Sequence, residues 1–258
     1  MNTQNDTLVS RQSSPTQTRS DSIWERYNSP IIWLLLVAYL GVTAFLVTVV
    51  FPVQFIDRSQ SGFFEPQGVI AIGVMGLIGV WLSMRTGFPG AWDPKMNNRQ
   101  RLVIPILAGL VLGSLFVATD VITGLSRLQE EQGLVQSTDV AFPASLFFYP
   151  AGAIFAEVIY RLLTIPLLLG SFSILVRGQA ARERLFWLLA IMTSLIEPLT
   201  NNAAAQVLAP LAMAFVLVQS FGTNFLQAVL FRKYGFLASI LLRVAFYIPY
   251  HIVGSFLK

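Results

Sequence analysis

The sequence predicts an all-α membrane protein, a polytopic bundle of about seven transmembrane helices. Three observations support this fold class: 55% of the residues are hydrophobic, only 12% are charged, and the apolar residues fall in long blocks. Soluble domains average about 45–50% apolar and about 25% charged residues. This chain therefore has too few charges to cover a surface in water, and its long apolar blocks are typical of membrane spans.

The first 29 residues differ from the rest of the chain. Residues 1–29 are rich in Ser, Thr, Gln and Asn and carry mixed charge, which predicts a disordered or surface-lying N-terminal tail. The first apolar block, Ile31–Phe51, is too long for the core of a signal peptide and lacks a small-residue cleavage site in the usual place. We therefore expect a retained first span, with residues 30–258 forming one transmembrane helical domain.

Six further apolar blocks follow, at Gly68–Met84, Leu102–Thr119, Ala141–Leu169, Leu185–Leu199, Ala203–Phe231 and Phe236–Leu257. A helix needs about 20 residues to cross the hydrocarbon core of a bilayer. The second and fifth of the seven blocks are therefore short, whereas the fourth and sixth are long enough to tilt, break or re-enter. Pro150, Pro166 and Gly222 are the expected break points. Seven is the best count of spans, and six to eight fit the same pattern.

The basic residues alternate along the loops between these blocks. Loops 85–101, 170–184 and 231–235 are rich in Lys and Arg, and the loops between them are poor in both. By the positive-inside rule this pattern predicts a multi-pass protein of the cell membrane with a cytoplasmic N-terminus. Membrane orientation thus explains the net charge of +4, and no nucleic-acid partner is expected. The chain has no cysteine, which excludes disulfides and thiolate metal sites.

Five ionisable residues lie inside the apolar blocks: Glu157, Arg161, Glu197, Arg243 and His251. A charge at the bilayer centre costs about 2.5–3.5 kcal/mol on insertion scales, so such residues usually face the interior of a bundle and find partners there. Two acids and two permanent cations leave this set close to charge balance when the histidine is neutral. We therefore expect the fourth, fifth and seventh spans to neutralise one another.

The spacing of these residues places them on shared helical faces. Glu157 and Arg161 are four residues apart, and Arg243, Tyr247 and His251 follow at intervals of four. Each feature also has a purely structural interpretation. The first two residues can form an ion pair that holds the bundle, and a histidine in an apolar helix is more often a hydrogen-bonded core residue than a ligand.

The segment Ala151–Arg161 resembles the first motif of the CPBP intramembrane proteases, the CAAX-processing and bacteriocin-immunity group. That motif has two adjacent glutamates and then, after three intervening residues, an arginine. Glu157 matches the second glutamate. Segments 85–101 and 233–251 are similar to a loop and to the final motif helix of the same family. The resemblance covers the chain from about residue 68 to the C-terminus and implies a CPBP-type transmembrane domain.

The resemblance also implies a catalytic site that this chain has lost. In the family, the first glutamate activates a water, and two histidines with an asparagine or aspartate complete the site. The corresponding positions here hold Ala156, then Asn201 or Thr200, then Arg243, and finally Tyr247. Alanine cannot act as a general base, and a guanidinium group has no lone pair for a metal. Activity by the family mechanism is therefore not expected.

The charge changes nevertheless come as a pair. Relative to the family pattern this chain gains Arg243 and also Glu197, which stands where the family has an aromatic residue. We therefore hypothesise that an ion-pair network between helices replaces the hydrolytic site, with Arg243 paired to Glu157 or Glu197. A buried pair of this kind needs good geometry and further hydrogen bonds to offset its desolvation.

Three functions follow from these observations. The first is a non-catalytic pseudoprotease without a cofactor, which binds a membrane protein or a prenylated or membrane-tethered peptide. The alternative is an active intramembrane endopeptidase that uses Glu157, Arg161 and His251 in a rearranged site, with zinc as its cofactor in the metal-dependent case. A third reading is a transporter whose intramembrane charges line a pathway, although the two halves of the chain show no inverted repeat.

Overall fold

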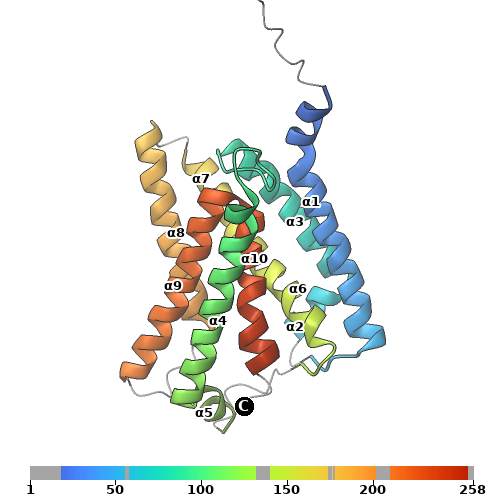
Figure 1. The fold of residues 1–258 in the computed structure, drawn as a ribbon, viewed down its shortest axis with the longest axis vertical. Helices are drawn as coiled ribbons and strands as arrows, with labels where there is room; N and C mark the ends of the chain where they lie inside the picture. Colours follow the sequence, from blue (N-terminus) through green and yellow to red (C-terminus); the bar gives the residue numbers. More distant parts are fainter. Residues whose placement is uncertain are drawn as a thin grey trace, which may run out of the picture.

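The computed structural model describes residues 19–55, 58–131, 140–173, 176, 178–201 and 210–254. Within these ranges the secondary structure is helical, without strands. Figure 1 shows the long helices lying side by side and running up and down the bundle. The first helix begins at the top of this view and the last one ends near the bottom, at the opposite end of the bundle.

Seven helical rods cross the bundle. They are α1 (Arg19–Phe45) with the π turn Leu46–Val50, α3 (Pro66–Arg85), the π turn Arg99–Val103 with α4 (Ile104–Thr123), α6 (Ser145–Glu157) joined through the π turn Val158–Leu163 to α7 (Thr164–Phe172), α8 (Gln179–Asn201), α9 (Pro210–Tyr234), and α10 (Phe236–Tyr247) with the π turn Ile248–Val253. Two short helices, α2 (Arg58–Phe64) and α5 (Leu125–Glu131), lie at the lower end in Figure 1.

Six of these rods are long and apolar enough to cross a membrane: Tyr27–Val50, Pro66–Arg85, Arg99–Thr123, Ser145–Phe172, Met213–Tyr234 and Phe236–Val253. The remaining predicted span, Leu185–Leu199, lies within α8, which packs along α9 but begins with three charged residues at positions 182–184. The described chain is therefore an all-α, polytopic membrane helix bundle, as predicted. The seven predicted spans correspond to the six apolar rods and the more polar α8.

The first helix starts earlier than the hydropathy predicts. Residues 1–18 of the predicted tail lie outside the described residues, but its last part, from Arg19, forms the first turns of α1. Asn28 and Ser29 are buried there. The Asn28 amide donates to the carbonyl of Trp92 at 3.2 Å, and the Ser29 hydroxyl accepts from the Ala91 amide at 2.9 Å. Contacts with the loop between α3 and α4 therefore hold this polar part of α1 in place.

The expected break points were wrong. Pro150 lies inside α6, Pro166 inside α7 and Gly222 inside α9, and none of them ends a helix. The irregularity in this rod is instead the π turn Val158–Leu163, just before Pro166. Proline lacks an N–H and crowds the carbonyl one turn before it, and a local π turn relieves both effects inside a membrane helix. The Thr164 hydroxyl also donates to a carbonyl of this turn.

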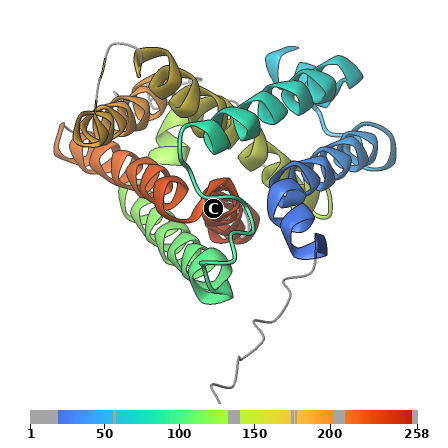
Figure 2. The same ribbon diagram turned by 90° about the horizontal axis from the view of Figure 1, so that it is seen from above.

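Glycines set the close approach of the helices. Figure 2 shows α10 near the centre of the bundle when it is seen from above. Gly109 and Gly113 of α4 lie directly against backbone carbonyls of α10. On the other side of the bundle, a Cβ added at Gly79 of α3 would stand 2.6 Å from the carbonyl oxygen of Leu162. Small residues at such contacts are typical of membrane helices, because they let backbones approach closely.

Candidate functional site

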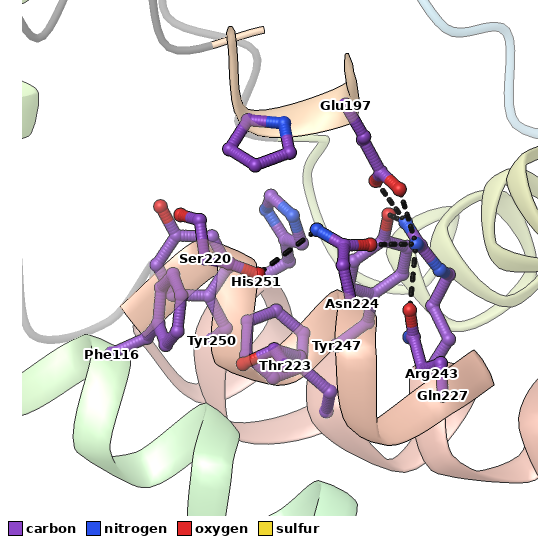
Figure 3. Close-up of a pocket in the computed structure, with 12 residues that line it drawn as sticks. Phe116, Glu197, Ser220, Thr223, Asn224, Gln227, Arg243, Tyr247, Tyr250 and His251 are labelled. Atoms are coloured by element: carbon purple, nitrogen blue, oxygen red, sulfur yellow. Dashed lines mark hydrogen bonds and ion pairs between the residues drawn. The ribbon is translucent and has the colours of Figure 1, made fainter. Parts of the chain in front are cut away.

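Four charged side chains from three helical rods meet inside the bundle. Glu157 ends α6, Arg161 lies in the following π turn, Glu197 belongs to α8, and Arg243 belongs to α10. Their exposed fractions are 1%, 1%, 8% and 5% respectively, so all four are buried. We call these four residues the polar centre. Figure 3 shows Glu197 and Arg243 of this group facing one another.

Arg243 contacts both glutamates of the polar centre. Its Nε lies 2.8 Å from Oε1 of Glu157, while its Nη1 and Nη2 lie 2.6 and 2.7 Å from the two carboxylate oxygens of Glu197. The contact with Glu197 is bidentate, an arrangement in which the planar guanidinium matches the carboxylate. The ion pairs that the sequence analysis hypothesised for Arg243 are therefore present, and they involve both acids.

Arg161 forms the second bridge between the same two acids. Its Nη1 lies 3.2 Å from Oε1 of Glu157 and 3.0 Å from Oε2 of Glu197. Two arginines and two glutamates give the polar centre a formal charge of zero. Within the described part of the chain, the Nε of Arg161 is buried without a hydrogen-bond partner, so this network leaves one donor unused.

Neutral side chains complete the network. Asn224 of α9 accepts hydrogen bonds from both arginines through Oδ1, the one from Arg243 being 3.0 Å long. Gln227 of α9 accepts from Arg243 at 2.9 Å, and the hydroxyl of Ser239 on α10 donates to Oε2 of Glu157. In addition to the three rods that supply the charges, α9 thus joins the polar centre. It contributes amides and no charge.

This contribution of α9 was not predicted, although the sequence contains a signal for it. Ser220, Asn224 and Gln227 are spaced four and three residues apart in an otherwise apolar helix, so they share one face. The structure turns that face inward, since all three residues are buried. The side-chain amide of Asn224 also donates to the carbonyl of Ser220 at 3.0 Å, which fixes its orientation.

Every carboxylate oxygen of the two glutamates accepts a hydrogen bond from another side chain. Each of the four carboxylate oxygens of Glu157 and Glu197 accepts from an arginine or from Ser239. A general base needs a lone pair within hydrogen-bond reach of the proton that it removes. Three of the four oxygens face guanidinium groups and Oε2 of Glu157 faces the Ser239 hydroxyl, so the observed contacts fit a structural connection between helices.

A cavity of about 160 Å³ adjoins the polar centre. Figure 3 shows Arg243 and Glu197 at one side of it and Phe116 and Tyr250 at the other. Its lining includes polar residues of α9 and aromatic residues of α4 and α10. The cavity therefore offers both hydrogen-bonding groups and aromatic faces to an occupant.

The other predicted site residues of α10 border this cavity. The hydroxyl of Tyr247 lies 3.5 Å from Nη1 of Arg243, at the edge of the polar centre. The ring of His251 stacks on Tyr149 of α6, with centroids 4.4 Å apart and planes 10° apart, and it meets the ring of Tyr250 at 4.6 Å. His251 therefore belongs to an aromatic cluster in the π turn that follows α10, about two helical turns beyond Arg243.

Two further positions named by the family resemblance lie elsewhere. Asn201 is the last residue of α8, and its side chain is outside the described part of the structure. Ala156 lines a separate apolar pocket, together with Phe63 and Phe155. Among the residues that the structure describes, no group of three or more His, Asp or Glu side chains gathers as possible ligands of one metal ion.

Comparisons with protein-family models, with curated proteins and with solved structures give no match for this chain. The resemblance to the CPBP proteases therefore stays a prediction. The geometry of the polar centre and its cavity is the basis on which a function can be argued.

Proposed function

We propose that this chain is a non-hydrolytic relative of the CPBP intramembrane proteases that binds a membrane protein or a membrane-tethered peptide. In this proposal the polar centre holds the helices together, and the adjoining cavity receives part of the partner. The observation that carries the proposal is the occupation of both carboxylates: Glu157 and Glu197 each accept from Arg161 and from Arg243.

The cavity supports a binding role of limited size. Its volume of about 160 Å³ is close to that of engineered cavities that bind benzene, so it fits one side chain and not an extended peptide. Thr223, Asn224 and Phe246 are among the residues that line it, so hydroxyl and amide groups and an aromatic ring border the same space. An aromatic side chain with a polar tip, projecting from a partner helix or peptide, fits these walls best.

Whether the protein hydrolyses peptides is tested directly on the purified protein in lipid nanodiscs. A farnesylated peptide with a C-terminal carboxylate serves as the probe, and mass spectrometry reads both cleavage and bound zinc. We expect no cleavage by the wild type. The variants are E157Q and, as a matched control, E183Q, which alters a half-exposed glutamate paired with Arg232. Cleavage that E157Q abolishes and E183Q preserves would overturn the non-hydrolytic proposal in favour of the endopeptidase.

Binding is tested with the same farnesylated peptide carrying a fluorophore. We expect the S220W variant to weaken binding at least fivefold, because the added ring fills the cavity beside Ser220. The control F215W places an equal ring on the exposed outer face of α9. Failure of the wild type to bind, or equal binding by S220W and F215W, would contradict the proposed role of the cavity.

We also propose that the N-terminus faces the cytoplasm of the cell, as the loop charges predict. The chain has no cysteine, so single cysteines report orientation without background. The connection between α3 and α4, which contains Lys95, and the start of α6, which follows Phe142, lie at opposite ends of the bundle (Figure 1). In intact cells we expect a membrane-impermeant maleimide to label F142C and to leave K95C unlabelled. The reverse labelling would show the opposite orientation.

A further inference from the structure

An apolar groove runs between α1 and α3 on the outside of the bundle. It has a volume of about 540 Å³ and is lined by Tyr27, Pro30, Leu77, Ile78, Val80, Trp81 and Met84. Except for Val80 and Pro30, these side chains are between 43% and 50% exposed. Tyr27 belongs to the first part of α1 and Met84 to the last turn of α3, so the groove lies toward the end of the bundle where α1 begins.

One cation stands at the end of this groove. The guanidinium of Arg85 lies 4.0 Å from the centroid of the Trp81 ring, in a cation–π contact. Arg85 is exposed, and within the described ranges its side chain forms no ion pair. The Trp81 ring, which lines the groove, holds the guanidinium beside it, where its N–H groups can donate to an oxygen-rich anion.

The surroundings of Arg85 are basic as well. Lys95 and Arg99 are exposed in the connection between α3 and α4, which begins directly after Arg85. Such positive charges next to a membrane surface attract anionic headgroups, by about 1 kcal/mol or fivefold for each Lys or Arg. Tyr27 and Trp81 add the aromatic residues that are typical of the boundary between hydrocarbon and headgroups.

We propose that this groove is a binding site for an anionic phospholipid. One acyl chain lies along Leu77 and Ile78 between the two helices, and the phosphate accepts hydrogen bonds from Arg85. The apolar lining suits the chain, the stacked guanidinium suits the charge, and both occur at the same end of the helices. A lipid, and not a second protein, is the occupant that matches this combination.

The test uses the full-length protein in detergent micelles and native mass spectrometry. Dioleoyl phosphatidylglycerol and dioleoyl phosphatidylcholine are titrated separately, so that only the headgroup differs. We expect the wild type to bind the first lipid about fivefold more tightly. R85Q removes this preference, whereas R99Q, which removes a neighbouring exposed cation, retains most of it. I78W fills the groove and weakens the binding of both lipids.

The controls keep the proposal falsifiable. Thermal unfolding shows whether each variant is folded, and R85K serves as a second variant because it retains the charge and is expected to retain part of the preference. Equal affinity of the wild type for the two lipids would overturn the proposal. An equal loss in R85Q and R99Q would do the same, since it would indicate general surface attraction without a site at the groove. Unchanged lipid binding by I78W would show that the lipid does not occupy the groove, and would also overturn the proposal.

Discussion

The rod formed by α6 and α7 meets its neighbours in two different ways. Arg161 and Leu162 are adjacent in sequence, yet Arg161 bridges the two buried acids while the carbonyl of Leu162 packs against Gly79 of α3. Lipid tails are as apolar as leucine, so apolar contact alone gives membrane helices little reason to associate. The bundle therefore relies on close backbone approach on the α3 side and on charge pairing on the α8 to α10 side.

The largest loss of unfolding free energy is expected where charged side chains join the α6–α7 rod to α8 and α10. Replacing Arg243 with methionine leaves Glu157 and Glu197 with only one of their two shared guanidinium groups, that of Arg161. Removing one partner of a buried pair costs about 3–5 kcal/mol. We expect the free energy of unfolding, measured by denaturant titration in bicelles, to fall by about that amount. R232M is the matched control, because its pair with Glu183 is 26% and 41% exposed and is worth about 0–1 kcal/mol. Equal losses in the two variants would contradict the distinction between buried and exposed pairs.

A smaller loss of unfolding free energy is expected where the backbone of the α6–α7 rod packs against α3. A Cβ at Gly79 would lie 2.6 Å from the Leu162 carbonyl, so G79A must push α3 away from the π turn. Overpacking of this kind costs about 1–3 kcal/mol in the same unfolding measurement. Gly41 of α1 has no atom within 4 Å of its added Cβ, and G41A is therefore expected to be neutral or slightly stabilising. If G79A is as stable as G41A, close approach does not hold α3 in place.

The smallest effect is expected for the hydroxyl that supports Glu157. Ser239 donates to Oε2 of this acid from a buried position on α10. S239A removes one hydrogen bond and leaves the ion pairs intact, at a cost of about 1 kcal/mol. S173A, which removes a hydroxyl bonded only within its own helix turn, is the control and should be close to neutral. A loss in S239A as large as that in R243M would show that the ion pairs are not the main contribution.

Much of this architecture could be predicted from the sequence, for a physical reason. Long apolar blocks have few ways to satisfy their backbones in lipid other than helices, so six of the seven expected spans are apolar helical rods. The four charges of the polar centre were also predictable, because each buried charge needs a partner and the apolar blocks contain two permanent charges of each sign. Their exact pairing was not, since both arginines contact both acids.

What the sequence did not reveal depends on packing. Asn224 and Gln227 were overlooked because neutral amides carry no charge that demands a partner, although their spacing shows them on one face. The prolines at 150 and 166 were expected to break a helix that tertiary contacts and a π turn keep continuous. The early start of α1 depends on hydrogen bonds to a loop more than 60 residues away.

The most direct test of the central claim is the coupling between Glu197 and Arg243. Unfolding free energies of the wild type, E197Q, R243Q and the double variant form a double-mutant cycle. The account predicts a coupling above about 1 kcal/mol, because R243Q leaves a buried carboxylate that E197Q then neutralises. Losses that add to within about 0.5 kcal/mol would contradict it, since they would show that the two side chains act independently.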